Sequence, residues 1–145
     1  MFNENTYENV RIALVAEDDT GARTALAGWL RGKGYGVLEA ATSVEALLLA
    51  AEFPETIDVL FTSLELRKFC NRYELAGCIK ASRPEMAVVY LSGEGVPNAE
   101  IAREILLEES GLMQKPLVRS EMESALASMA RRELLSPERE RMEWA

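Results

Sequence analysis

Five short apolar runs alternate with five segments of helical periodicity, and this alternation leaves the chain very few possible folds. The expected strands are Val10–Ala16, Val37–Ala40, Ile57–Ser63, Met86–Leu91 and Gly111–Gln114. Ile57–Ser63 organises the rest, because a strand that is apolar at most positions is usually covered on both faces, as in the middle of a parallel sheet. Strands that alternate with helices at this spacing are joined by right-handed crossovers. The sequence therefore predicts an α/β protein with a doubly wound, five-stranded parallel sheet.

The helical segments are marked by apolar residues three or four positions apart and by capping residues at their starts. The first helix is expected to begin at Asp19 or Thr20, either of which can cap it, and to end near Lys33. The second opens on Thr42, with Glu45 three residues later as a capping box. The apolar face of this second helix is expected to hold Val44, Leu47, Leu48 and Ala51. The core residues expected of the third helix are Leu75, Ala76 and Ile79, and those of the last helix, from about Val118 to Leu134, are Met122, Ala125, Leu126 and Met129.

A length of 145 residues fits one domain with one core. Residues 1–9 are polar and are expected to be flexible, residues 10–134 hold the predicted domain, and residues 135–145 form a charged tail. Trp144 near the end of this tail is either disordered or an anchor for a partner.

The net charge of −8, from 16 basic and 24 acidic side chains, restricts the possible partners. Nucleic-acid phosphates and anionic lipids both require clustered Lys and Arg, so neither nucleic acid nor a membrane surface is expected to bind. The sequence contains no apolar run long enough to span a bilayer and no signal peptide, which favours a cytoplasmic protein.

Cysteine and histidine usage adds two chemical limits. Cys70 and Cys78 lie in one predicted helical segment and are expected to be semi-buried free thiols, as in a reducing compartment. The chain has no histidine, so it lacks the commonest general base and zinc ligand and cannot be a histidine phosphodonor.

Polar groups follow four of the five predicted strands. Because the carboxyl ends of parallel strands meet at one edge of the sheet, and ligands of such folds bind there, these groups form the candidate site. They are Glu17 and Asp18 after the first strand, Ser63 at the end of the third, Ser92 after the fourth and Lys115 after the fifth.

The order and spacing of these groups resemble the receiver domain of bacterial response regulators, the CheY-like superfamily, over residues 10–134. Val-Ala-Glu-Asp-Asp matches the acidic pair of that family, Leu-Ser-Gly-Glu-Gly its hydroxyl position, and Gln-Lys-Pro its lysine and the following proline with a cis peptide bond. The resemblance implies a flavodoxin-like (βα)5 fold with strand order 2-1-3-4-5 and a function in two-component or phosphorelay signal transduction.

Ser63 departs from the family at the position that carries its chemistry. The resemblance implies an aspartate there, which accepts a phosphoryl group from a kinase histidine while the acidic pair holds Mg²⁺; Ser92 and Lys115 occupy the phosphate-contact positions. A serine hydroxyl is neutral and needs a base before it can attack. With one carboxylate fewer, Glu17 and Asp18 are expected to bind Mg²⁺ weakly or not at all.

Other departures point in the same direction. Leu112 stands where the family has an aromatic switch residue, and Arg67 and Asn71 stand where it often has proline and glycine. We therefore expect a degenerate receiver, or pseudo-receiver, that is not an enzyme and acts through protein–protein contact without phosphorylation. The expected partners are a histidine kinase, a phosphotransfer protein, or a second copy bound through the face of the fourth helix, fifth strand and fifth helix, where Leu106 or Leu107 would be exposed.

Several alternatives remain at this stage. Ser63 or Glu65 could accept a phosphoryl group as a non-standard residue, or the pocket could bind a small ligand. The acidic pair could instead serve the start of the first helix, since helix amino ends favour negative charge. Lys115 could pair with Glu17 or Asp18, and Ser63 could bond Lys115 or water. A hydrolase is the weakest alternative, because the sequence shows no nucleophile–base pair.

Overall fold

The computed structural model describes residues 10–66, 73–93, 99–108 and 110–134. Its centre is a sheet of five parallel strands in the order β2-β1-β3-β4-β5. The strands are β1 (Ile12–Ala16), β2 (Gly36–Ala40), β3 (Val59–Ser63), β4 (Ala87–Ser92) and β5 (Gly111–Gln114). The predicted fold class and strand order are therefore confirmed.

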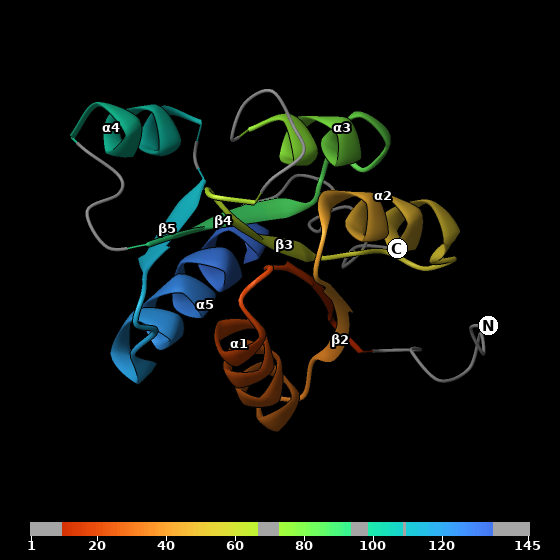
Figure 1. Ribbon diagram of the computed structural model, residues 1–145, viewed down its shortest axis with the longest axis horizontal. Coiled ribbons are helices and arrows are strands. Elements are labelled where there is room, and N and C mark those ends of the chain that lie inside the picture. Colours follow the sequence, from red (N-terminus) through yellow and green to blue (C-terminus); the bar gives the residue numbers. More distant parts are fainter. Residues whose placement is uncertain (1–9, 67–72, 94–98, 109, 135–145) are drawn as a thin grey trace.

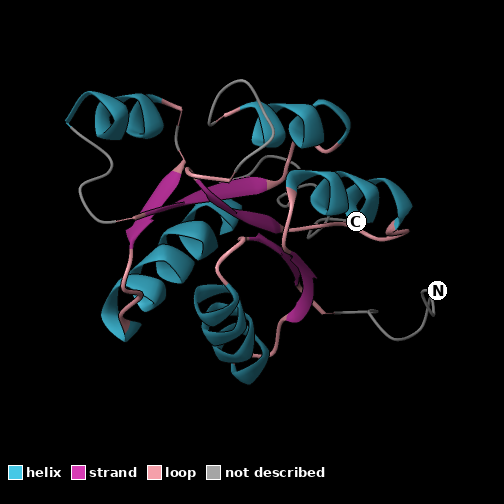
Figure 2. Cartoon of the chain, viewed as in Figure 1, coloured by secondary structure: helices cyan, strands magenta, loops and turns pink. Residues whose placement is uncertain are grey.

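Five helices cover the two faces of this sheet. They are α1 (Thr20–Gly32), α2 (Ser43–Glu52), α3 (Glu74–Ser82), α4 (Ala99–Leu107) and α5 (Arg119–Leu134). Figure 1 shows α1 and α5 on one face and α2, α3 and α4 on the other, and Figure 2 shows the same layers by type of element. Alternate side chains of the strands therefore enter two separate cores. In the described part of the chain, none of the helices is both long and apolar enough to cross a membrane.

The connection from α1 to β2 follows the signals in the sequence. Asp19 caps α1 by accepting a hydrogen bond from the Gly21 amide at 3.0 Å, as one of the two predicted caps. After the helix, Gly34 has a φ of 94°, a left-handed conformation that glycine adopts without steric cost. The chain then reverses, so that β2 pairs with β1 at the edge of the sheet.

The predicted apolar face of α2 is wrong at Val44, Leu48 and Ala51, whereas Leu47 is half-buried and packs against the core, and the predicted cap is present. The Glu45 amide donates to the Thr42 hydroxyl at 3.1 Å. The residues of α2 that are buried are Ser43, Ala46 and Ala50. Val44 and Leu48, expected in the core, are 52% and 55% exposed. Apolar residues occur on nearly every side of this helix, so periodicity did not single out one face. Its fully buried side chains are small, and Leu47 and Leu49 pack half-buried against the same core.

Smaller differences concern element ends and one thiol. β1 begins at Ile12 and leaves Val10 exposed. This difference is small, because the ends of elements are what pattern analysis locates least well. β4 ends one residue later than predicted, at Ser92. Cys78 is exposed rather than semi-buried. Predictions for Arg67, Cys70, Asn71 and Trp144, and for the side chains of Leu106 and Leu107, lie outside the described residues.

Candidate functional site

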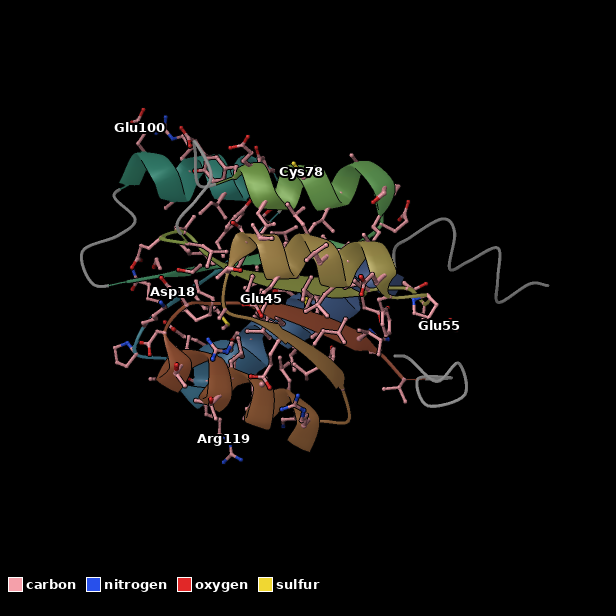
Figure 3. The ribbon with its side chains drawn as sticks, turned by 45° about the vertical axis from the view of Figure 1, so that its right-hand side comes forward. Asp18, Glu45, Glu55, Cys78, Glu100 and Arg119 are labelled. Atoms are coloured by element: carbon pink, nitrogen blue, oxygen red, sulfur yellow. The ribbon has the colours of Figure 1, made fainter. Side chains whose placement is uncertain are left out.

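The carboxyl ends of the strands bring the predicted site residues to one edge of the sheet. The register pairs Ala16 of β1 with Thr62 of β3, so Glu17 and Ser63 follow at adjacent strand ends. Ser92 ends β4 and Lys115 directly follows β5. Figure 3 shows Asp18 at this edge and Glu55 at the opposite edge.

Glu17 and Lys115 form an ion pair at the centre of this edge. Glu17 is fully buried, whereas the Lys115 side chain is 18% exposed. Burial raises the pKa of the Glu17 carboxyl, and Lys115 opposes part of that rise by favouring the charged form. The main chain of Glu17 is fixed as well: its amide donates to the Ala40 carbonyl at 3.0 Å, and its carbonyl accepts from Arg23 at 2.7 Å. Lys115 is therefore committed to an internal carboxylate.

Ser63 uses its hydroxyl to cap the turn that follows β3. The Ser63 oxygen accepts a hydrogen bond from the Glu65 amide at 3.1 Å, and the side chain is 2% exposed. The next amide, of Leu64, continues the ladder by donating to the Leu91 carbonyl at 2.8 Å. This local bond was not among the predicted partners of Ser63, which were Lys115 and water. The hydroxyl thus has a structural role that an unactivated serine can fill.

Ser92 and Lys115 are joined through the main chain. The Lys115 amide donates to the Ser92 carbonyl at 2.8 Å, and the Lys115–Pro116 peptide bond is cis, as the resemblance implied. The Ser92 hydroxyl is fully buried and has no hydrogen-bond partner within the part of the chain that the structure describes. A buried hydroxyl of this kind is costly to leave unpaired, and it lies at the strand end that borders the candidate site.

A contact that the sequence did not predict joins the loops after β3 and β4. The exposed Glu65 carboxylate accepts a hydrogen bond from the Gly93 amide. A Cβ atom at Gly93 would lie 2.6 to 2.9 Å from the atoms of that carboxylate, so a side chain at this position would displace the carboxylate from the amide. We call this contact the Glu65–Gly93 clamp. The glycine after Ser92 was the only signal for it in the sequence.

We expect Gly93→Ala to open the Glu65–Gly93 clamp, because the added methyl group and the carboxylate cannot occupy the same space. The amide of residue 93 should then exchange its hydrogen several-fold faster, which corresponds to the loss of one hydrogen bond worth about 1 kcal/mol. NMR-detected hydrogen exchange measures this rate. Glu65→Ala should have the same effect at the Gly93 amide, whereas Glu65→Gln keeps an acceptor oxygen and serves as the control. Unchanged exchange in both Gly93→Ala and Glu65→Ala would show that the clamp does not protect this amide.

The position of the missing aromatic residue, Leu112, lies beside an aromatic pair on other elements. Leu112 is half-buried and is paired in register with Tyr90 of β4. Tyr90 is buried and packs edge-to-face against Tyr73, with ring centroids 5.5 Å apart. Burial raises the pKa of the Tyr90 phenol. Sequence reasoning missed this pair because it treated Tyr90 only as one residue of a strand.

A Mg²⁺ ion prefers carboxylate and phosphate oxygens in near-octahedral geometry, and the donor groups at this edge can be compared with that preference. Glu17 is paired with a cation, and Ser63 supplies a neutral hydroxyl that already accepts a hydrogen bond. Asp18 is the remaining, exposed carboxylate of the predicted acidic pair. Over the described residues, Asp, Glu and Cys side chains nowhere gather in a group of three that could hold a metal ion.

Comparison with solved structures places this arrangement of strands and helices among known folds. A response regulator receiver domain protein from Clostridium thermocellum is similar, with a TM-score of 0.70 and 27% identity, over 88% of this chain and 100% of that one. The chain has the receiver-domain fold. A CheY-like receiver domain protein from Methanospirillum hungatei is similar with a TM-score of 0.73 and 22% identity, over 88% of this chain and 99% of that one.

The receiver-domain fold also occurs in a structural neighbour that is described by a different function. The structure described as an adenylate cyclase from Rhodopirellula baltica has a TM-score of 0.75 at 17% identity, and the match covers 94% of this chain and 99% of that one. No protein-family model and no curated protein matches the sequence. The structural neighbours thus support the receiver superfamily, and the activity of this chain has to be argued from its own residues.

Proposed function

We propose that this chain is a receiver-fold module of two-component or phosphorelay signalling that acts by protein–protein contact and does not accept a phosphoryl group. The observation that carries this proposal is the state of Ser63. Its hydroxyl is buried, accepts a hydrogen bond from the Glu65 amide, and stands at the position of the family's acceptor aspartate. The module is proposed to be cytoplasmic and to catalyse no reaction.

The chemistry of phosphoryl transfer supports this proposal. Such transfer depends on positioning and on cations that neutralise the phosphoryl oxygens. In this chain Lys115 is neutralised by Glu17, and the carboxylate set does not suit Mg²⁺. Activating the Ser63 hydroxyl would need a nearby base, and the buried carboxylate next to it is already paired with Lys115. Ser63 is therefore disfavoured as an acceptor.

Glu65 is also disfavoured as an acceptor, because its carboxylate is engaged in the Glu65–Gly93 clamp. The clamp supports a second part of the proposal, namely that the loops after β3 and β4 adopt their conformation without phosphorylation. A carboxylate from the β3 loop holds the first amide of the β4 loop, so the two loops are joined without any added group. The partner is proposed to be a histidine kinase, a phosphotransfer protein or a second copy of the chain bound through α4, β5 and α5.

The test is incubation of the full chain with acetyl phosphate and Mg²⁺, followed by intact-mass measurement. We expect no mass gain for the natural sequence. The Ser63→Asp variant, treated in parallel, is the matched control for the assay. A gain of one acid-labile phosphoryl group by the natural sequence would overturn the proposal; its loss in Glu65→Gln would then identify Glu65 as the acceptor, and an acid-stable phosphate would point to Ser63.

A further inference from the structure

The outer face of α2 is exposed and apolar in a way that neither the sheet edge nor the fold explains. Val44 and Leu48 are two of the four exposed large hydrophobic residues in the described part of the chain. They are four positions apart on one helix, so their side chains are neighbours on its surface. Single exposed apolar residues need no explanation, whereas adjacent ones on one helix face form a small apolar patch that a partner could cover.

The exposed residues of α2 are arranged as an apolar stripe with an acidic flank. At about 100° per residue, Ala51, Val44 and Leu48 fall within about 60° of the helix circumference. All three are exposed, and we call them the α2 stripe. The exposed Glu52 and Glu45 begin about 40° beyond Leu48, on one side of the stripe only. Figure 3 labels Glu45 at the start of this helix.

Glu45 suits its place in the helix, because it lies in the first turn and its carboxylate accepts from the Thr42 hydroxyl, whereas Glu52 is not explained by the stability of the helix. Glu52 is the last residue of α2, where the helix dipole favours a positive charge, and the last turn contains no basic residue. The helix as a whole contains no Lys or Arg, so Glu45 and Glu52 have no basic neighbour of their own helix to pair with. A carboxylate that is unfavourable for its helix, next to an exposed apolar stripe, indicates a partner with positive charge.

Hydrogen bonds fix both ends of α2, through its own N-cap residue at the start and through a residue that follows α3 at the end. Thr42 caps its first turn, and Arg83 donates to the carbonyls of Ala50 and Phe53 at 2.9 Å each. The stripe is therefore a pre-formed surface on a rigid helix. Binding to such a surface does not require the helix to be ordered first, which lowers the entropic cost of association.

We propose that the α2 stripe binds an amphipathic helix of another protein whose apolar face is flanked by Lys or Arg. This inference rests on the proposed function, because both assign protein contact as the activity of the chain. A second copy is disfavoured: an antiparallel two-fold pair of stripes would set Glu45 of one copy against Glu52 of the other, in a protein of net charge −8. A basic helix, in contrast, would bury Val44 and Leu48 and place its cations beside both carboxylates.

The test uses a capped amphipathic peptide of about 18 residues, with Leu at helical spacing and Lys on the flanks, as the probe. It is titrated into the isotopically labelled full chain, and NMR shifts locate the binding site. We expect the shifts to centre on α2 and Leu48→Gln to weaken binding at least about tenfold, as for a central apolar contact. Val118→Thr, which changes an exposed apolar residue before α5, is the matched control and should leave binding unchanged.

Two further sets of measurements test the role of charge and the other possible occupants of the α2 stripe. Glu45→Lys with Glu52→Lys should weaken binding, and raising the salt from about 0.01 M to about 0.1 M should weaken it too, because the Debye length falls from about 30 to about 10 Å. Shifts centred elsewhere, or binding unaffected by Leu48→Gln, would overturn the proposal. A dimer lost in Leu48→Gln would assign the stripe to a second copy, and α2 shifts on Trp144→Ala would assign it to the chain's own tail. None of these results would alter the phosphorylation experiment, so the two proposals fail separately.

Discussion

Replacing Lys115 by methionine is expected to destabilise the protein by about 3–5 kcal/mol at neutral pH, because it leaves a buried carboxylate without its counter-charge. Glu17 is fully buried and Lys115 is its ion-pair partner. Methionine keeps much of the length and apolar character of the lysine stem. The decrease in the free energy of unfolding is therefore due to the missing charge and not to a cavity. Urea unfolding followed by circular dichroism measures the free energy of unfolding.

The pH dependence of the Lys115→Met variant follows from the direction of the Glu17 pKa. Burial raises this pKa, and Lys115 lowers it, so the variant should raise it further above its ordinary value. A carboxyl group with a raised pKa in the folded state contributes stability that is fully present below its ordinary pKa and is lost as the pH rises through the folded-state pKa. The difference in the free energy of unfolding between Lys115→Met and the natural sequence should therefore be smallest below about pH 4 and increase toward neutral pH.

Matched variants separate the ion pair from packing. Glu17→Gln with Lys115→Met removes both charges and should restore stability to within about 1 kcal/mol, since a buried pair replaced as a whole is often neutral. Glu17→Gln alone should cost less than Lys115→Met alone, because the Lys115 side chain is partly exposed and can be hydrated, whereas Glu17 cannot. Equal decreases in the free energy of unfolding for the two single variants would contradict the explanation that Lys115→Met leaves an unpaired charge in the core. A decrease in Lys115→Met that does not depend on pH would contradict it as well.

Local chain signals were enough to predict much of the fold. β5 has the predicted bounds, Gly111–Gln114, because a short apolar run there stands between two helical patterns. Leu75, Ala76 and Ile79 of α3 are buried as predicted, since that helix has one apolar face among polar residues. α2 has no such contrast, and its buried face was assigned incorrectly for that reason.

The candidate site was predicted mainly as a set of residues; the one contact predicted for it that the structure shows is the pairing of Lys115 with Glu17, one of its two possible partners. The strand order alone brings Glu17, Ser63 and Lys115 to one edge, because carboxyl ends of parallel strands meet. Which of these groups pair depends on side-chain reach and on the turn after β3, and neither is encoded in residue spacing. The Glu65–Gly93 clamp joins residues 28 positions apart through the parallel pairing of β3 with β4, so only the folded register reveals it.

Restoring a carboxylate by Ser63→Asp is expected to make the protein respond to Mg²⁺. The new side chain would stand at the end of β3, next to Glu17 at the end of β1. Without metal, it adds a third carboxylate to an edge that has one cation, Lys115, and should lower stability through like-charge repulsion. With Mg²⁺ at about 100 times its dissociation constant, binding to the folded state should stabilise it by about 2.7 kcal/mol. For a domain of this size, that is a rise of about 10 °C in Tm, measured by thermal unfolding with and without the ion.

The natural sequence and Ser63→Asn are the controls for this gain. Asparagine has nearly the shape of aspartate but no charge, so neither protein should gain more than about 1 °C from the same Mg²⁺ concentration. An equal gain in Ser63→Asn would show that the shape of the side chain matters and its charge does not. A Mg²⁺-dependent rise in the Tm of the natural sequence would show that Glu17 and Asp18 suffice to hold the ion. In that case the hydroxyl at Ser63, in place of a carboxylate, would not prevent Mg²⁺ from binding at this edge.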